Sequence, residues 1–171
     1  MNTSVLVLRY DRDRPGRYAA ESHRIRAALG HDLAAIEHIG STSIPGLVAK
    51  PTIDLLVGVG TLPLPPRVFW AFWELGYVHM PGLGTSERLF FGRGRGTPEP
   101  YNVHVVVPGS AVWKDNLAFR DFLRTHPQVA SEYAEIKRWA AQDPPHYGER
   151  KSPFIEATLE QARAWAGRSD A

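Results

Sequence analysis

The run from Thr52 to Val59, TIDLLVGV, constrains the fold of this chain most strongly, because it is apolar and rich in branched side chains almost throughout. Such a run is typical of a strand that is covered on both faces of a sheet. A single carboxylate, Asp54, interrupts it. Because a buried carboxylate without a partner is costly, we expect Asp54 to have a specific role.

The segment before this strand has the features of a phosphate-binding turn. Gly40 follows a candidate strand and precedes three hydroxyl residues, which are Ser41, Thr42 and Ser43. A glycine lets the backbone approach a ligand closely, and the start of a helix supplies aligned N–H donors and partial positive charge. Lys50 adds a cation. We therefore predict a bound phosphate here, with Mg²⁺ or Mn²⁺ held against it by Asp54. The alternative is a plain helix cap followed by a structural, hydrogen-bonded Asp54.

Strand patterns fill the first part of the chain and helical patterns fill the rest. Strands are expected at 4–8, 35–39, 52–59, 77–80, 88–91 and 102–107, and helices at 12–30, 67–75, 111–126, 127–142 and up to about 165. The Gly/Pro-rich segment 92–100 predicts a hairpin loop between two of these strands. A break is expected at 143–148, and Pro153 either begins the last helix or kinks it.

These patterns predict one α/β (α+β) domain over residues 1–171. A mixed sheet is expected within about 1–110, and the helices of about 111–167 are expected to pack on it. The chain has no cysteine, which excludes disulfides and thiolate metal sites. No apolar run approaches the roughly 18 residues of a membrane span, and the N-terminal stretch lacks a basic region, so we expect a cytoplasmic protein. A net charge of +2 fits a small anionic ligand and gives no indication of nucleic-acid binding.

Several long segments resemble the GrpB family, in the same order along the chain. They are IEHIGSTSIPGLVAKPTIDLLVGV, YNVHVVVPGS, LAFRDFLRTHPQVASEYAEIK and YGERKSPFI. The resemblance extends from about Tyr10 to Ala162. The family is regarded as a branch of the nucleotidyltransferase superfamily, and it also occurs fused behind dephospho-CoA kinase. The resemblance implies a nucleotidyltransferase-like mixed sheet with flanking helices. It also implies a transferase that acts on a nucleotide or another phosphorylated small molecule with a divalent metal.

The chain departs from the superfamily pattern at one informative position. That pattern places two carboxylates at alternate positions of the strand, whereas this strand carries Asp54 and then Leu56. A two-metal site needs several anionic ligands. Glu37 is a weak substitute for the missing acid, and His104 falls near the position of the third carboxylate. By resemblance, His104 is therefore a possible metal ligand or general base.

Two other functions stay open at this stage. The first is a nucleotide- or anion-binding module with a degenerate active site, which the missing carboxylate favours. The second is metal-independent chemistry with His104 as the base. If the protein is an enzyme, with or without a metal, Asp54 and His104 should face one cleft, within about 12 Å of each other.

The C-terminal helices carry cations that either bind the ligand or form an ordinary solvated face. Tyr133 and Lys137 are four residues apart, as are Tyr147 and Lys151, so each pair shares a helical face. Resemblance to the family favours Arg120, Lys137 and Lys151 as substrate-binding residues. Arg93 and Arg95 are expected in the loop at 92–100, and Arg88 at the start of the strand at 88–91. These arginines either close over an anion or belong to an exposed, flexible hairpin tip.

Overall fold

The computed structural model describes residues 6–169. Of the strand expected at 4–8, residues 4 and 5 lie outside that range, and the described part forms only an isolated antiparallel bridge between Leu8 and Ala49. Five strands form one mixed sheet in the order β1-β2-β5-β4-β3. Their bounds are β1 Leu33–Ile39, β2 Ile53–Val59, β3 Val78–His79, β4 Leu89–Arg93 and β5 Tyr101–Val106. β2 is parallel to β5, and the other neighbouring pairs are antiparallel. The expected mixed α/β architecture is therefore confirmed.

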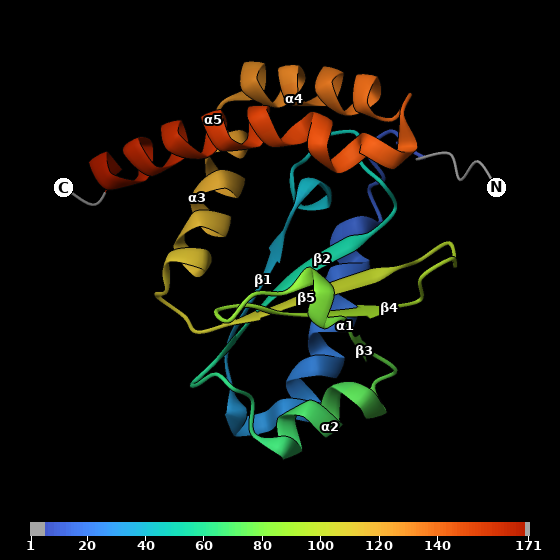
Figure 1. Cartoon of the computed structure of the whole chain (residues 1–171), viewed down its shortest axis with the longest axis vertical. Coiled ribbons are helices and arrows are strands. Elements are labelled where there is room, and N and C mark those ends of the chain that lie inside the picture. The colour runs from blue at the N-terminus through green and yellow to red at the C-terminus, as the bar shows by residue number, and fades with distance from the viewer. Residues whose placement is uncertain (1–5, 170–171) are drawn as a thin grey trace.

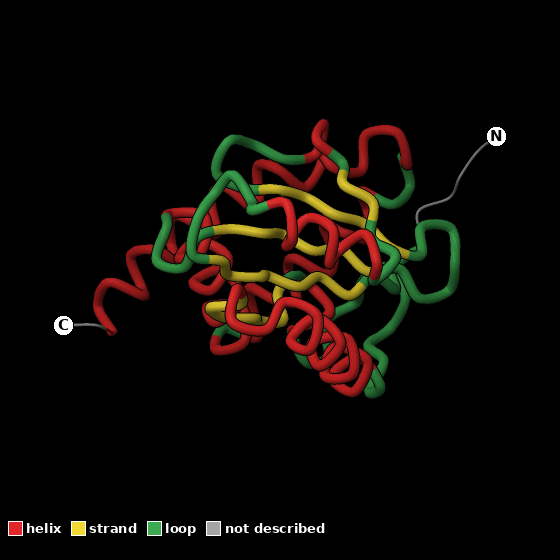
Figure 2. Tube along the Cα trace, turned by 90° about the horizontal axis from the view of Figure 1, so that it is seen from below, coloured by secondary structure: helices red, strands yellow, loops and turns green. Residues whose placement is uncertain are grey.

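One face of the sheet is covered by α1 (Arg14–Leu29) and α2 (Pro66–Glu74). Alternate residues of β2 and β5, such as Leu55, Val57 and Val103, point to this face and join a fully buried apolar core. Figure 2 shows the strands as a layer between helices. The run 52–59 is thus an interior strand, as its sequence predicts.

The other face carries Asp54, Leu56, Asn102 and His104, because these residues occupy the alternate positions of β2 and β5. Three helices follow on this side: α3 Ala111–Thr125, α4 Pro127–Ala140 and α5 Tyr147–Ser169. In Figure 1, α4 and α5 run side by side across the end of the sheet where β1 stops and β2 starts. They therefore close the end of the sheet at which Asp54 lies.

Two details differ from the sequence expectation. The break at 143–148 is shorter than expected, because a single 3₁₀ turn, Pro144–His146, leads directly into α5 at Tyr147. Pro153 lies inside α5, which supports the second of its two alternatives. Within the described part of the chain, no helix is long and apolar enough to cross a membrane.

Candidate functional site

Gly40 and Asp54 meet at the mouth of the sheet. Gly40 ends β1 with a φ of +68°, in the left-handed region that glycine tolerates. A Cβ added to Gly40 would lie 2.6 Å from Oδ2 of Asp54. No other residue type therefore fits at this position without displacing the carboxylate. Asn102 on β5 donates its side-chain amide to Oδ1 of Asp54 at 2.9 Å, which fixes the orientation of the carboxylate.

The segment after Gly40 is only one turn long. Ser41–Ser43 form a 3₁₀ helix, and the Ser43 hydroxyl donates to the carbonyl of Gly40 at 2.6 Å. Such a short element supplies little of the aligned dipole expected from the sequence. Positive charge at this position must therefore come from side chains.

Three lysines supply that charge. A cavity of about 250 Å³ opens beside Asp54, and we call it the lysine cavity. Its lining includes Ser41, Thr42, Lys50, Asp54, Asn102, Lys137, Tyr147 and Lys151. The ammonium groups of Lys50 and Lys151 lie 4.1 and 4.4 Å from the centre of the Tyr147 ring, within cation–π range. With three cations and one carboxylate, the lining carries an excess of positive charge.

Burial makes the charged forms of these lysines unfavourable and lowers their pKa values. Lys137 is 2% exposed, and its ammonium donates to the carbonyl of Val48 at 2.7 Å. Desolvation first, and repulsion from Lys151 second, lower the pKa of Lys137 to about 7. Burial also lowers the pKa values of Lys50 and Lys151, and Asp54 opposes the shift in each case. A bound anion would relieve the mutual repulsion of all three lysines.

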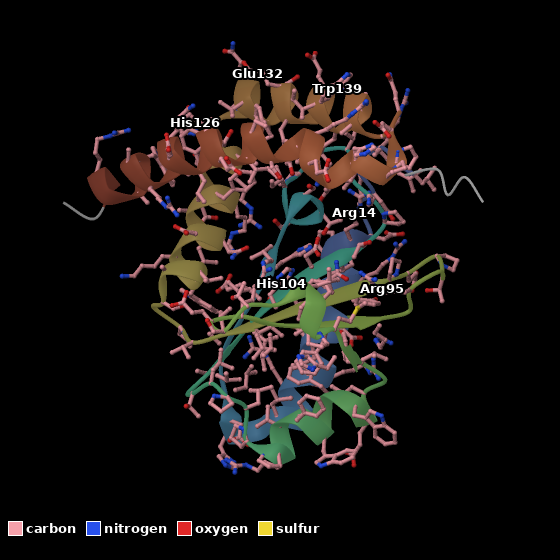
Figure 3. The ribbon with its side chains drawn as sticks, viewed as in Figure 1. Arg14, Arg95, His104, His126, Glu132 and Trp139 are labelled. Carbon is pink, nitrogen blue, oxygen red and sulfur yellow. The ribbon has the colours of Figure 1, made fainter. Side chains whose placement is uncertain are left out.

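His104 shares the cleft with Asp54, so the geometric prediction from the sequence is confirmed. Nε2 of His104 lies 3.9 Å from Oδ1 of Asp54, far inside the 12 Å limit. That distance is too long for a hydrogen bond. Nδ1 of His104 is buried without a hydrogen-bond partner, and the edge of Phe90 packs on the ring. His104 is labelled on the sheet in Figure 3.

These donors fit one divalent ion and do not fit two. The 3.9 Å between Asp54 and His104 can be spanned by one ion with ligand bonds of about 2 Å, and Mg²⁺ commonly takes one or two carboxylates plus phosphate oxygens. Leu56, at the second carboxylate position, is fully buried with Ile39 and Val106. Among the described residues, no group of three or more His, Cys, Asp or Glu side chains converges on one point.

A second cavity, of about 470 Å³, adjoins the first and shares Ser41, Asp54 and Lys151 with it. We call it the Arg88 cavity. Apolar side chains of α3 and α5 line it, together with a polar group of residues. The apolar residues are Val112, Phe119, Ile155 and Leu159, and the polar ones include Arg88, His104, Asp115, Asn116 and Tyr133. The site therefore has a cationic half and a mixed half, with Asp54 at the boundary.

Two predicted site residues are used elsewhere. The Arg120 guanidinium donates to Glu37 at 2.7 Å, to Asp121 at 2.7 Å and to the carbonyl of His38. This network ties α3 to β1, and neither Arg120 nor Glu37 lines the lysine or Arg88 cavities. The structure thus does not bring Arg120 to the candidate ligand site or Glu37 to the metal position, because each satisfies the charge of the other.

The remaining hydroxyls divide between structure and site. Thr42 lines the lysine cavity, and its hydroxyl is hydrogen-bonded to His38 at 3.1 Å. Ser43 is buried and lines neither cavity. His38 faces α1 and stacks on Tyr18, and burial lowers its pKa to about 4. As alternation requires, Glu37 and His38 point to opposite faces.

Sequence reasoning missed three contributors to the site. Asn102, which the sequence gives no role beyond its place in the strand at 102–107, donates a hydrogen bond to Asp54. Tyr133, expected only to share a helical face with Lys137, lines the Arg88 cavity and stacks on Phe154. Arg88, expected at the start of the strand at 88–91, lines the second cavity. Strand alternation from His104 and Phe90 was the one signal that could have placed Arg88.

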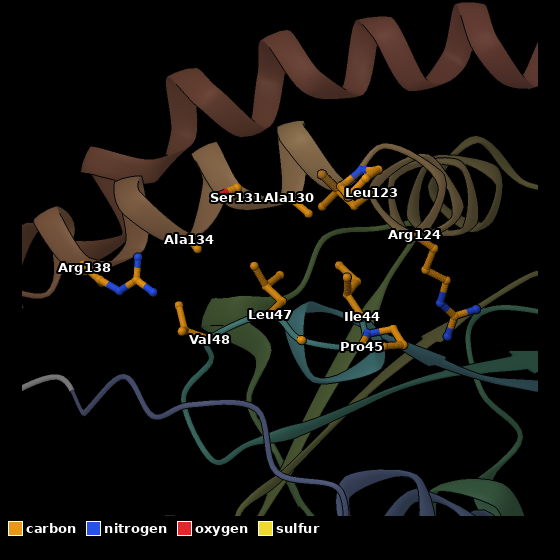
Figure 4. A pocket seen from close by; sticks show the side chains of 12 residues that line it. Ile44, Pro45, Leu47, Val48, Leu123, Arg124, Ala130, Ser131, Ala134 and Arg138 are labelled. Carbon is orange, nitrogen blue, oxygen red and sulfur yellow. The ribbon is translucent and has the colours of Figure 1, made fainter.

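The loop after Gly40 also borders a third cavity, which shares no lining residue with the other two. Figure 4 shows it between the loop, at Ile44–Val48, and helices α3 and α4. Its walls are mainly apolar, with Arg124 and Arg138 near its two ends. Arg124 donates to the carbonyl of Ser43 at 2.9 Å and so holds the loop in place.

Comparison with known proteins gives a consistent family. Residues 4–161 match the family model described as GrpB protein. The UPF0157 protein YqkA of Bacillus subtilis is 36% identical over 88% of this chain, which spans 45% of that longer relative. The UPF0157 protein BH1888 of Halalkalibacterium halodurans is 33% identical over 95% of this chain and 85% of its own length. The crystal structure of the conserved protein GrpB from Enterococcus faecalis matches with a TM-score of 0.83 at 31% identity, over 94% of this chain and 99% of that one.

Proposed function

This chain belongs to the GrpB protein family, and from the site that its residues build we propose that it binds a nucleotide or another phosphorylated small molecule in the lysine cavity. The observation that carries the proposal is the convergence of Lys50, Lys137 and Lys151 on a cavity that holds one carboxylate. Polyanions are the ligands whose charge such a cavity offsets. The resemblance to nucleotidyltransferases supports the same ligand class.

We propose nucleotidyltransferase-like transfer as the chemistry, with each role taken by residues of this chain. The lysines hold the phosphates, and Gly40 leaves room for the Asp54 carboxylate beside them. His104 is placed to accept a proton at Nε2 from a hydroxyl that approaches through the Arg88 cavity. A single Mg²⁺ or Mn²⁺, held by Asp54 together with ligand oxygens, would offset phosphate charge during transfer and leave Nε2 of His104 free to act as the base. In the alternative arrangement Nε2 of His104 is a ligand of the ion, and His104 then does not accept the proton.

The second candidate function is binding without turnover. The fully buried Leu56 favours it, because the position that completes a two-metal site is part of an apolar cluster. Metal-independent transfer with His104 as base is the remaining alternative. These functions are separated by incubating the protein with ATP and a panel of hydroxyl acceptors, with and without Mg²⁺, and assaying for released pyrophosphate or phosphate. Release only with Mg²⁺ indicates metal-dependent transfer, release in both cases indicates metal-independent transfer, and no release indicates binding alone.

The binding step is tested with Asp54→Asn, which preserves shape and removes the charge. For the wild type, we expect ATP to bind more tightly with Mg²⁺ than without it. In Asp54→Asn, Mg²⁺ should no longer increase the affinity for ATP. Metal-free ATP should bind to this variant at least as tightly as to the wild type, because one negative charge has left the cavity. Calorimetric titration measures both. An unchanged increase in ATP affinity from Mg²⁺ in the variant would show that Asp54 is structural. It would leave the binding module and metal-independent transfer as the remaining functions.

A further inference from the structure

Among the described residues, no acidic side chain pairs with the positive charge of Arg88. Arg88 precedes β4, in which Phe90 pairs with His104, so alternation places Arg88 on the face of the sheet that carries His104. Its Nη2 donates to the carbonyl of Leu83 at 3.0 Å, which holds the side chain in place. Its Nε is buried and has no hydrogen-bond partner. The guanidinium is therefore held in position, and its buried Nε is left without a hydrogen-bond partner.

The two acids and the one amide that line the Arg88 cavity are already engaged. The carboxylate of Asp115 accepts two bonds from Arg163, at 2.7 and 2.6 Å. The side-chain amide of Asn116 donates to the carbonyl of Val112 at 2.8 Å. Asp54 is oriented by Asn102 and faces the lysines. No acid that lines this cavity is thus left to neutralise Arg88, and a buried donor without a partner is costly.

The chemistry of the walls specifies the rest of the ligand. Opposite the charged groups, Val112, Phe119, Ile155 and Leu159 present apolar surface. A single guanidinium matches a single planar carboxylate through paired hydrogen bonds, whereas the three-lysine cavity next to it matches phosphates. We propose that the Arg88 cavity is the binding site of a second ligand, a small organic acid whose carboxylate is held by Arg88 and whose carbon body packs against the apolar wall.

This site goes beyond the phosphate site proposed above and can be tested without it. The two cavities share Ser41, Asp54 and Lys151, so the two ligands would meet at the Asp54–His104 boundary. The acid would then lie next to the phosphate, as the two substrates of a transfer reaction must.

Ligand-observed NMR with benzoate tests the proposal, using benzamide as the neutral analogue of the same shape. We expect benzoate to bind the full chain with a dissociation constant on the order of 1 mM, as suits so small a ligand. Benzamide should bind at least about tenfold more weakly, and Arg88→Gln should weaken benzoate by about the same factor, since a charged hydrogen bond is lost. Arg88→Lys should retain part of the affinity. Saturating pyrophosphate should leave benzoate bound.

Arg67→Gln is the matched control, because Arg67 is an exposed arginine that pairs with Asp32 on the opposite face of the molecule. It should bind benzoate like the wild type. Equal binding of benzoate and benzamide, unchanged binding in Arg88→Gln, or no binding to a folded wild type would overturn the proposal. Displacement of benzoate by pyrophosphate would also overturn it, because the carboxylate would then occupy the lysine cavity. Absence of pyrophosphate binding, in contrast, contradicts only the phosphate site.

Discussion

At the scale of single residues, the site depends on Gly40 more than on any hydroxyl near it. Its positive φ and its contact distance to Asp54 are separate requirements, and a side chain violates both. Gly40→Ala should therefore lower the free energy of unfolding by about 1–3 kcal/mol. It should also weaken nucleotide binding in the presence of Mg²⁺, because the Asp54 carboxylate must move. Urea unfolding and calorimetric titration measure the two effects.

Gly16→Ala provides the control for this substitution. Gly16 lies in α1, has no positive φ, and an added Cβ would meet nothing within 4 Å. Alanine in a helix is more favourable than glycine by about 0.5–1 kcal/mol, so this variant should be as stable as the wild type or more stable. Equal destabilisation by the two substitutions would contradict the role assigned to Gly40.

At the scale of elements, two arginines attach helices in different ways. Arg120, 11% exposed, ties α3 to β1 through Glu37, whereas Arg163, 56% exposed, ties α5 to α3 through Asp115. Arg120→Gln should cost about 1–3 kcal/mol of stability, because it leaves partly buried acceptors unpaired. Arg163→Gln should cost less than about 1 kcal/mol, as surface ion pairs do.

The variant Arg120→Gln also tests whether Arg120 is structural. Arg120→Gln should leave the affinity for pyrophosphate within about twofold of the wild type, measured by calorimetry where both proteins are folded, since no hydrogen bond to the ligand is removed. A loss of affinity larger than that, without a loss of stability, would return Arg120 to the set of ligand-binding residues favoured by the family resemblance.

This contrast shows how far sequence reasoning reaches. Alternation along β2 and β5 placed Asp54 and His104 on one face, because strand geometry is local and regular. Arg120 and Lys137 are both helical cations, and nothing local distinguishes them. Whether each residue lines the cavity depends on which face of its helix meets β1 or the 44–50 loop, and only tertiary packing determines that. The contact of Lys50 with Tyr147 is equally non-local.

At the scale of the whole molecule, the lysine cavity costs stability in the absence of a ligand. The pKa of Lys137 in the folded state, about 7, is below its ordinary value of 10.5, so above pH 7 the unfolded chain binds more protons than the folded one. The free energy of unfolding should therefore rise with pH between about pH 7 and 9, with a slope of up to about 1.4 kcal/mol per pH unit. The lowered pKa values of Lys50 and Lys151 act in the same direction.

Urea unfolding at pH 7, 8 and 9 measures this slope. Lys137→Met should reduce it, because the titrating group is gone, whereas Lys114→Met should leave it unchanged, because Lys114 is exposed on α3 and lines neither the lysine cavity nor the Arg88 cavity. A free energy of unfolding that falls from pH 7 to 9 in the wild type would contradict a lowered pKa of Lys137 in the folded state.

The proposed function of the molecule rests on the claim that the three lysines of the lysine cavity form an anion-binding site. Calorimetric titration with inorganic pyrophosphate, without metal, tests that claim most directly on the wild type, the double variant Lys50→Met/Lys151→Met, and Lys114→Met. We expect the wild type and Lys114→Met to bind alike, and the double variant to bind about 100-fold more weakly, since two charged contacts worth about tenfold each are lost. Equal affinity in all three proteins, or no binding to the wild type, would contradict the account.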